Sequence, residues 1–160
     1  MSEMEVDKPY DYAEENNLRV VLPASNEIQV DLDTPQQAAQ FKQLWATLEG
    51  NGFILMVEES RSQSGNRHMH VRFALDNNPM ADACSLLSSP KAETLVRIAL
   101  QAIMGSDPVR EFLGLRRFLE QTDRPPSLFF EVKETPISTA ARRLVLLSTF
   151  DQPEAEECPY

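Results

Sequence analysis

Residues 27–57, EIQVDLDTPQQAAQFKQLWATLEGNGFILMV, predict a strand, a helix and a second strand in succession. Apolar and polar residues alternate over the first seven positions, which is the period of a half-buried strand. Thr34 can accept a hydrogen bond from a backbone N–H at a helix start, and Pro35 suits the first helical position. Apolar residues then recur at helical spacing up to the Gly-Asn-Gly sequence at 50–52, and the second strand follows at 53–57. A right-handed crossover would make the two strands parallel.

Further elements on both sides of this unit complete an α/β (α+β) prediction. Strands are expected at 18–22, which would form a hairpin with 27–33, and at 67–75 and 127–133; helices are expected at 91–104 and from Asp107 to about Glu120. Loops are expected at 58–66 and 76–90, while 137–150 fits a helix or a last strand at 144–148. We expect a sandwich in which two or three helices pack on one face of a mixed or antiparallel sheet.

A single domain over residues 18–150 accounts for most of the chain. With 160 residues, 42% of them hydrophobic, the chain can bury one substantial core. The formal net charge is -10, of which residues 1–15 carry -5 and residues 151–160 carry -4, leaving -1 for the rest. We therefore expect acidic disordered tails at 1–17 and 151–160. The near-neutral body can still present a basic face to nucleic acid, and the tails can engage a basic protein partner.

Cysteine usage and hydropathy predict a cytoplasmic protein. Cys84 and Cys158 lie far apart and form neither a disulfide framework nor a four-ligand zinc pattern. No apolar run approaches the roughly 20 residues that span a bilayer, and the acidic N-terminal region lacks the features of a signal peptide. We expect no membrane partner.

The first candidate site is the pair Asp31 and Asp33. Their spacing places both carboxylates on one face of a strand, roughly 7 Å apart. Two such carboxylates repel one another unless a cation lies between them, and Mg²⁺ or Mn²⁺ prefers hard oxygen ligands. The alternative is a solvated strand face in which Asp33 caps the following helix.

The second candidate site is the polar face of the strand at 67–75, where His68, His70 and Arg72 alternate with apolar residues. Two imidazoles at this spacing can bind one transition metal or stand beside a phosphate. Ser64-Gly65 precedes them in a loop that can offer backbone N–H groups to an anion. The alternative is a surface strand with no ligand.

The corner Gly105-Ser106-Asp107-Pro108 is typical of a helix stop, a cap and a restart. Arg110, in the first turn of the helix that follows, can reach a phosphate from this corner. Whether these groups converge on Asp31 and His68 depends on which strands are neighbours, and on which sheet face each side chain lies.

The order of these segments resembles the archaeo-eukaryotic primase superfamily, whose primase-polymerases carry an acid-x-acid metal motif and a later Ser-Gly-x-His type motif. The matching residues are Val30-Asp31-Leu32-Asp33 and Ser64-Gly65-Asn66-Arg67-His68. The resemblance implies that Asp31 and Asp33 bind Mg or Mn and that His68 contacts a nucleotide phosphate. The superfamily usually requires a third acid, for which Glu131 is the nearest candidate, because Asp107 looks more like a helix cap. The stretch Ile98 to Glu111 also resembles short phage-encoded proteins.

Two functions of different classes follow. The first is metal-dependent nucleotide or nucleic-acid binding, or nucleotidyl transfer in DNA replication, by a minimal primase-like core with Asp31, Asp33 and His68 as catalytic residues. Ser64, Gly65, His70, Arg72 and Arg110 would then bind the substrate. The second is a noncatalytic, phage-type accessory or inhibitor protein that binds another protein through its acidic tails. A small metal-dependent hydrolase that uses the histidine pair is a third reading.

Overall fold

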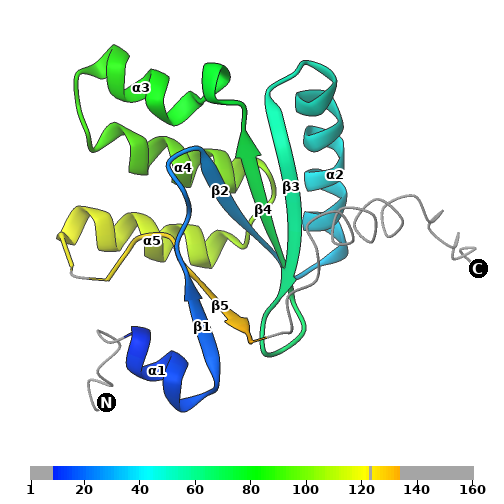
Figure 1. Ribbon diagram of the computed structural model, residues 1–160, viewed down its shortest axis with the longest axis vertical. Coiled ribbons are helices and arrows are strands. Elements are labelled where there is room, and N and C mark those ends of the chain that lie inside the picture. Colours follow the sequence, from blue (N-terminus) through cyan, green and yellow to red (C-terminus); the bar gives the residue numbers. More distant parts are fainter. Residues whose placement is uncertain (1–8, 123, 134–160) are drawn as a thin grey trace, which may run out of the picture.

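The computed structural model describes residues 9–122 and 124–133, and this part of the chain is a mixed α+β fold with antiparallel sheets and five α-helices (Figure 1). The elements in chain order are α1 (Pro9–Glu15), β1 (Leu18–Val21), β2 (Glu27–Leu32), α2 (Pro35–Gly50), β3 (Ile54–Arg61), β4 (Arg67–Phe73), the 3-10 turn η1 (Leu75–Asn77), α3 (Pro79–Leu87), α4 (Ala92–Ile103), α5 (Pro108–Glu120) and β5 (Phe129–Val132). The prediction left open a mixed or an antiparallel sheet, and the structure has two antiparallel sheets.

The predicted strand-helix-strand unit is β2, α2 and β3. Thr34 accepts a hydrogen bond from the backbone N–H of Gln37, whose side chain in turn accepts from the Thr34 N–H, so a capping box starts α2. In the sheet order β2-β4-β3, β4 is antiparallel to both neighbours. The strands β2 and β3 are therefore parallel to one another, as the crossover predicts, but β4 lies between them.

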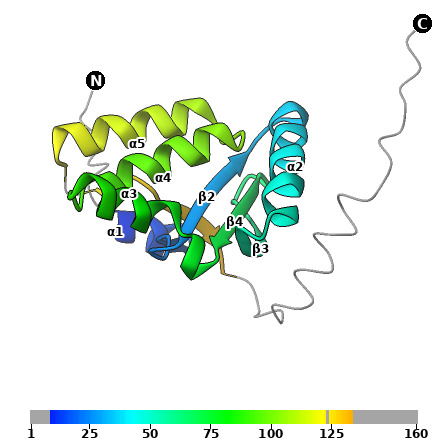
Figure 2. The same cartoon turned by 90° about the horizontal axis from the view of Figure 1, so that it is seen from above.

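The main core lies between this three-stranded sheet and helices α2 and α4. It consists of apolar side chains from alternate positions of β2 and β4, together with residues of the two helices: Ile28, Val30, Leu32, Met69, Val71, Phe73, Phe41, Trp45, Val96 and Leu100. Beside the sheet, α3, α4 and α5 pack against one another in that order (Figures 1 and 2). Helix α4 thus connects α5 to the sheet.

The predicted hairpin of the first two strands is wrong. β1 pairs with β5, Leu18 opposite Val132, in a separate antiparallel sheet. β5 lies across the polar face of the three-stranded sheet, where the Phe129 ring stacks on His68 with centroids 3.8 Å apart. Both faces of β2 are consequently buried, including Gln29, so the prediction of a half-buried strand is also wrong.

Two segments predicted as loops contain regular structure. β3 extends to Arg61, so 58–66 is mostly the second half of a strand and the turn into β4. Residues 79–87 form α3, for which Asn78 caps the first turn by accepting from the Met80 N–H. The end of β3 is polar, and its conformation is determined by pairing with β4, whereas α3 is a short helix that begins at the Asn78 cap.

The N-terminal segment also differs from the prediction of a disordered tail at 1–17. Residues 9–15 form α1, where Ala13 is buried and the Tyr12 ring lies 4.9 Å from that of Phe130. The predictions for 1–8, 137–150 and 151–160 fall outside the described residues. Within the described part, no helix is long and apolar enough to cross a membrane.

Candidate functional site

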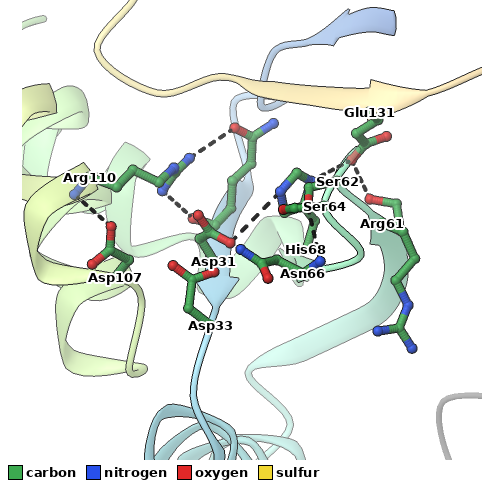
Figure 3. A network of polar contacts seen from close by, with 12 residues as sticks. Asp31, Asp33, Arg61, Ser62, Ser64, Asn66, His68, Asp107, Arg110 and Glu131 are labelled. Carbon is green, nitrogen blue, oxygen red and sulfur yellow. Dashed lines mark hydrogen bonds and ion pairs between the residues drawn. The ribbon is translucent and has the colours of Figure 1, made fainter.

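Asp31 and His68 are opposite one another across the β2–β4 ladder, so their side chains lie on the same face of the sheet. His68 Nε2 is 3.7 Å from Asp31 Oδ1 (Figure 3). The structure therefore brings one residue of each predicted site, Asp31 and His68, together at this end of the sheet.

A third carboxylate, that of Asp107 at the start of α5, lies beside those of Asp31 and Asp33. Asp31, Asp33 and Asp107, here called the acidic cluster, each offer an oxygen, and these three oxygens all lie within 4.8 Å of one another (Figure 3). Asp107 is also the predicted helix cap, because it accepts hydrogen bonds from the backbone N–H groups of Val109 and Arg110. Glu131, the sequence's candidate for a third acid, lies instead on the other side of His68.

The corner before α5 is fixed to the end of β2 by its backbone. The Asp107 N–H donates to the Asp31 carbonyl at 2.9 Å, and the Asp31 N–H donates to Ser106 Oγ at 3.0 Å. Gly105 has a φ of +92°, and a Cβ there would lie 2.8 Å from the Gln37 carbonyl oxygen. Glycine is therefore required for the close approach to α2 that brings Asp107 to the cluster.

The electrostatics of Asp31 show that negative charge is crowded in the cluster. Burial raises the pKa of Asp31, and the carboxylates of Asp33 and Asp107 raise it further, to about 7, against the opposing effect of Arg110. Oδ1 of Asp31 is buried and has no hydrogen-bond partner among the described residues. A cation or a proton would relieve this repulsion.

A cavity of about 320 Å³ opens beside the cluster. Its charged lining contains Asp31 and Asp107 together with three arginines, and its walls contain apolar side chains such as Leu113 and Phe129. The three arginines, here called the arginine group, are Arg110, Arg117 and Arg124. The cavity thus combines carboxylates with guanidinium groups.

His68 lines the same cavity and is nearly buried, with 6% of its side chain exposed. Its Nδ1 makes no hydrogen bond in the described part of the chain; the nearest carboxylate oxygen, Glu131 Oε1, is 3.8 Å away. Burial lowers the pKa of His68 despite the opposing influence of Glu131. The ring is therefore neutral near pH 7 and retains an acceptor nitrogen.

His70 and Arg72 lie on the same sheet face but do not reach the acidic cluster. His70 lies between two carboxylates, with Nδ1 3.1 Å from Glu27 and Nε2 2.5 Å from Glu131, and Arg72 donates to Glu27 at 2.8 Å. Both line a different cavity, formed with Arg19 and the turn after β1. The structure therefore separates these two residues from the other predicted site residues.

The Ser-Gly loop is the turn between β3 and β4. Gly65, with a φ of +89°, donates its N–H to the Ser62 carbonyl, and Ser64 Oγ lies 2.9 Å from Ser62 Oγ. Ser62, which sequence reasoning missed, lines the cavity beside the acidic cluster, whereas Ser64 lines a neighbouring cavity beside Tyr12. The Gly65 N–H predicted to meet an anion is engaged within the turn.

Arg110 is placed by several contacts at the cavity. It pairs with Glu111, donates to the Gln29 carbonyl at 2.9 Å, and lies 4.5 Å above the centre of the Phe129 ring. Arg110 lines the cavity beside the acidic cluster, and its contact with a phosphate stays a prediction.

Comparison of the chain with protein-family models, with curated proteins and with solved structures finds no significant match.

Proposed function

We propose that this protein binds nucleotides or nucleic acid through a divalent metal ion at the acidic cluster and catalyses nucleotidyl transfer there. The observation that carries the proposal is the convergence of three carboxylates from two distant segments on one point, beside a cavity that also contains His68 and the arginine group. Crowded carboxylates raise the free energy of the folded protein unless a cation binds. Here these carboxylates lie at the edge of an open cavity, where a cation can reach them.

The donor set fits Mg²⁺ or Mn²⁺. Both ions prefer carboxylate oxygens, and both usually bind through a few carboxylates plus substrate phosphates. Asp31 Oδ1, which lacks a hydrogen-bond partner among the described residues, would be one ligand, with Asp33 and Asp107 supplying the others. When bound, such an ion orients phosphates and neutralises charge that develops during phosphoryl transfer.

The groups around the cluster suit a phosphate ester. The neutral ring of His68 can donate a hydrogen bond from its one N–H to a phosphate oxygen, and the arginine group can offset negative charge. In nucleotidyl transfer, a hydroxyl oxygen attacks the α-phosphorus of a nucleoside triphosphate. The bond from that phosphorus to the oxygen bridging the β-phosphate breaks, pyrophosphate leaves, and the hydroxyl proton passes to solvent.

The test begins with metal binding. Titration of the protein with Mn²⁺, followed by electron paramagnetic resonance, should show one site that is lost in Asp31→Ala combined with Asp33→Ala. Asp82→Asn, which changes an exposed carboxylate on α3, is the matched control and should bind Mn²⁺ like the wild type. Nucleotidyl transfer, measured with Mn²⁺, a primed template and all four nucleoside triphosphates, should follow the same pattern. Wild-type protein with neither metal binding nor transfer would overturn the proposal.

A further inference from the structure

Arg117 stands out within the arginine group because no carboxylate of the described residues pairs with it. It is half-buried on the cavity side of α5. Within residues 9–122 and 124–133, its guanidinium forms no ion pair and no hydrogen bond, and the charged groups that act on it are Arg124 and Arg110. Burial lowers the pKa of Arg117, and these two positive charges lower it further. The position therefore favours an anion that the described residues do not supply.

Its neighbour in sequence shows the contrast. Arg116 is exposed and donates to Glu120, one turn later on the same helix, at 2.7 Å. In the part of the chain that the structure describes, Arg116 thus has a carboxylate partner on α5, whereas Arg117 has none. Arg117 lines the cavity together with Arg124 and with Arg110, which is paired with Glu111.

The cavity is long enough to separate charges of opposite sign. Asp107 caps the start of α5, and Arg117 follows ten positions later, which corresponds to about 15 Å along a helix. Both residues line the same cavity. A ligand that meets the acidic cluster through a metal and also reaches Arg117 must therefore be elongated and carry several negative charges.

We propose that Arg117, flanked by Arg110 and Arg124, binds the terminal phosphates of a nucleoside polyphosphate whose other phosphates meet the metal at the acidic cluster. This inference rests on the proposed function and specifies its substrate as the free nucleotide. A phosphodiester of a nucleic-acid backbone carries one charge per phosphate and does not match a cluster of three guanidinium groups as well as a polyphosphate chain does.

The experiment compares two probes that lack a base, inorganic tripolyphosphate and orthophosphate, each titrated as its Mn²⁺ mixture into the full chain by calorimetry. Wild-type protein should bind tripolyphosphate at least tenfold more tightly than orthophosphate. Arg117→Gln should weaken tripolyphosphate binding by about tenfold, the loss of one charge-assisted contact, and change orthophosphate binding less than twofold. Arg116→Gln is the matched control on the same helix and should leave both affinities unchanged.

The outcomes separate the inference from the proposed function. Arg117→Gln removes no hydrogen bond or ion pair within the described fold and keeps most of the aliphatic stem, so circular dichroism and the urea midpoint should stay close to the wild type. A folded Arg117→Gln variant that binds tripolyphosphate like the wild type, or loses both probes equally, would overturn the inference. Mn²⁺ binding to the protein alone is measured in parallel. Its absence in the wild type would overturn the proposed function, whereas its presence with unchanged tripolyphosphate affinity in Arg117→Gln overturns the inference alone.

Discussion

His68 and His70 lie two residues apart on the same face of β4, yet they belong to different environments. His70 is held between Glu27 and Glu131; burial alone would lower its pKa, but the hydrogen bonds to these two carboxylates raise it to about 9. The pKa of His68 is lowered, chiefly by burial. The polar face of the sheet is thus divided. At one end, here called the closed end, the charges of His70 and Arg72 are paired with Glu27 and Glu131. The other end, here called the open end, leaves the acidic cluster and the His68 imidazole beside a cavity.

The largest expected effect comes from breaking the closed end. Glu131→Gln removes the carboxylate that accepts from His70, Ser60 and Arg19, and leaves the charge of a buried imidazolium less compensated. Loss of one partner of a buried ion pair typically costs about 3–5 kcal/mol. Urea unfolding should therefore show a decrease of about 3 kcal/mol in the free energy of unfolding.

Glu120→Gln serves as the control for this variant, because its partner Arg116 is an exposed residue on α5. Its unfolding midpoint should be indistinguishable from that of the wild type. If Glu131→Gln behaved in the same way, the closed end would not be the stabilising half of the face.

The second effect is a dependence of stability on pH above neutrality. The folded-state pKa of His70 is raised from 6.5 to about 9, so the stabilisation is fully present below pH 6.5 and is lost as the pH rises through 9. Between pH 6.5 and pH 9 the decrease is on the order of 2–3 kcal/mol. The full pKa difference of about 2.5 corresponds to about 3.5 kcal/mol, and the titration is incomplete at both of these pH values. Urea unfolding measured at intervals from pH 6 to pH 10 gives this profile.

The same profile in His70→Gln identifies its source. The glutamine variant should be less stable than the wild type at pH 6, and the free energy of unfolding should change much less between pH 6.5 and pH 9. A wild-type decline that persists undiminished in the variant would assign the titration to another group and would remove the distinction between the two histidines.

The sequence predicted the two halves of the candidate site but not how they are completed. The alternation of residues over 27–33 and 67–73 places Asp31 on one strand face and His68 on another, because side chains alternate strictly along a strand. Only the register of the β2–β4 ladder, which pairs Asp31 with His68, shows that the two faces are the same one. Strand neighbours are set by long-range packing, which local patterns do not reveal.

Asp107 and β5 illustrate what local sequence patterns did not predict. The local pattern correctly identifies Asp107 as a helix cap, but its place in the acidic cluster depends on a backbone hydrogen bond to Asp31, 76 positions earlier in the chain. The pairing of Leu18 with Val132 spans most of the described chain. Gly105 is the one local sign that the chain approaches α2 closely at this corner. In the sequence, however, such a glycine cannot be distinguished from one that simply ends a helix.

The smallest expected effect has the opposite sign and tests the open end. Asp31→Asn removes a carboxyl group whose pKa is raised from 3.8 to about 7. Ionised Asp31 therefore destabilises the folded state. This destabilisation is complete above pH 7 and absent below pH 3.8. At pH 8 without metal, the variant should be more stable than the wild type by about 1 kcal/mol in urea unfolding, after allowance for screening and for Arg110. The gain should shrink as the pH falls toward 4.

Asp76→Asn, at an exposed position, controls for a general effect of net charge. A destabilised Asp31→Asn variant would mean that Arg110 already compensates the carboxylate, and the open end would then be a second closed one. A stabilised variant that no longer binds Mn²⁺ would show that the protein retains this charge at a cost to its own stability, as expected of a site kept for a ligand.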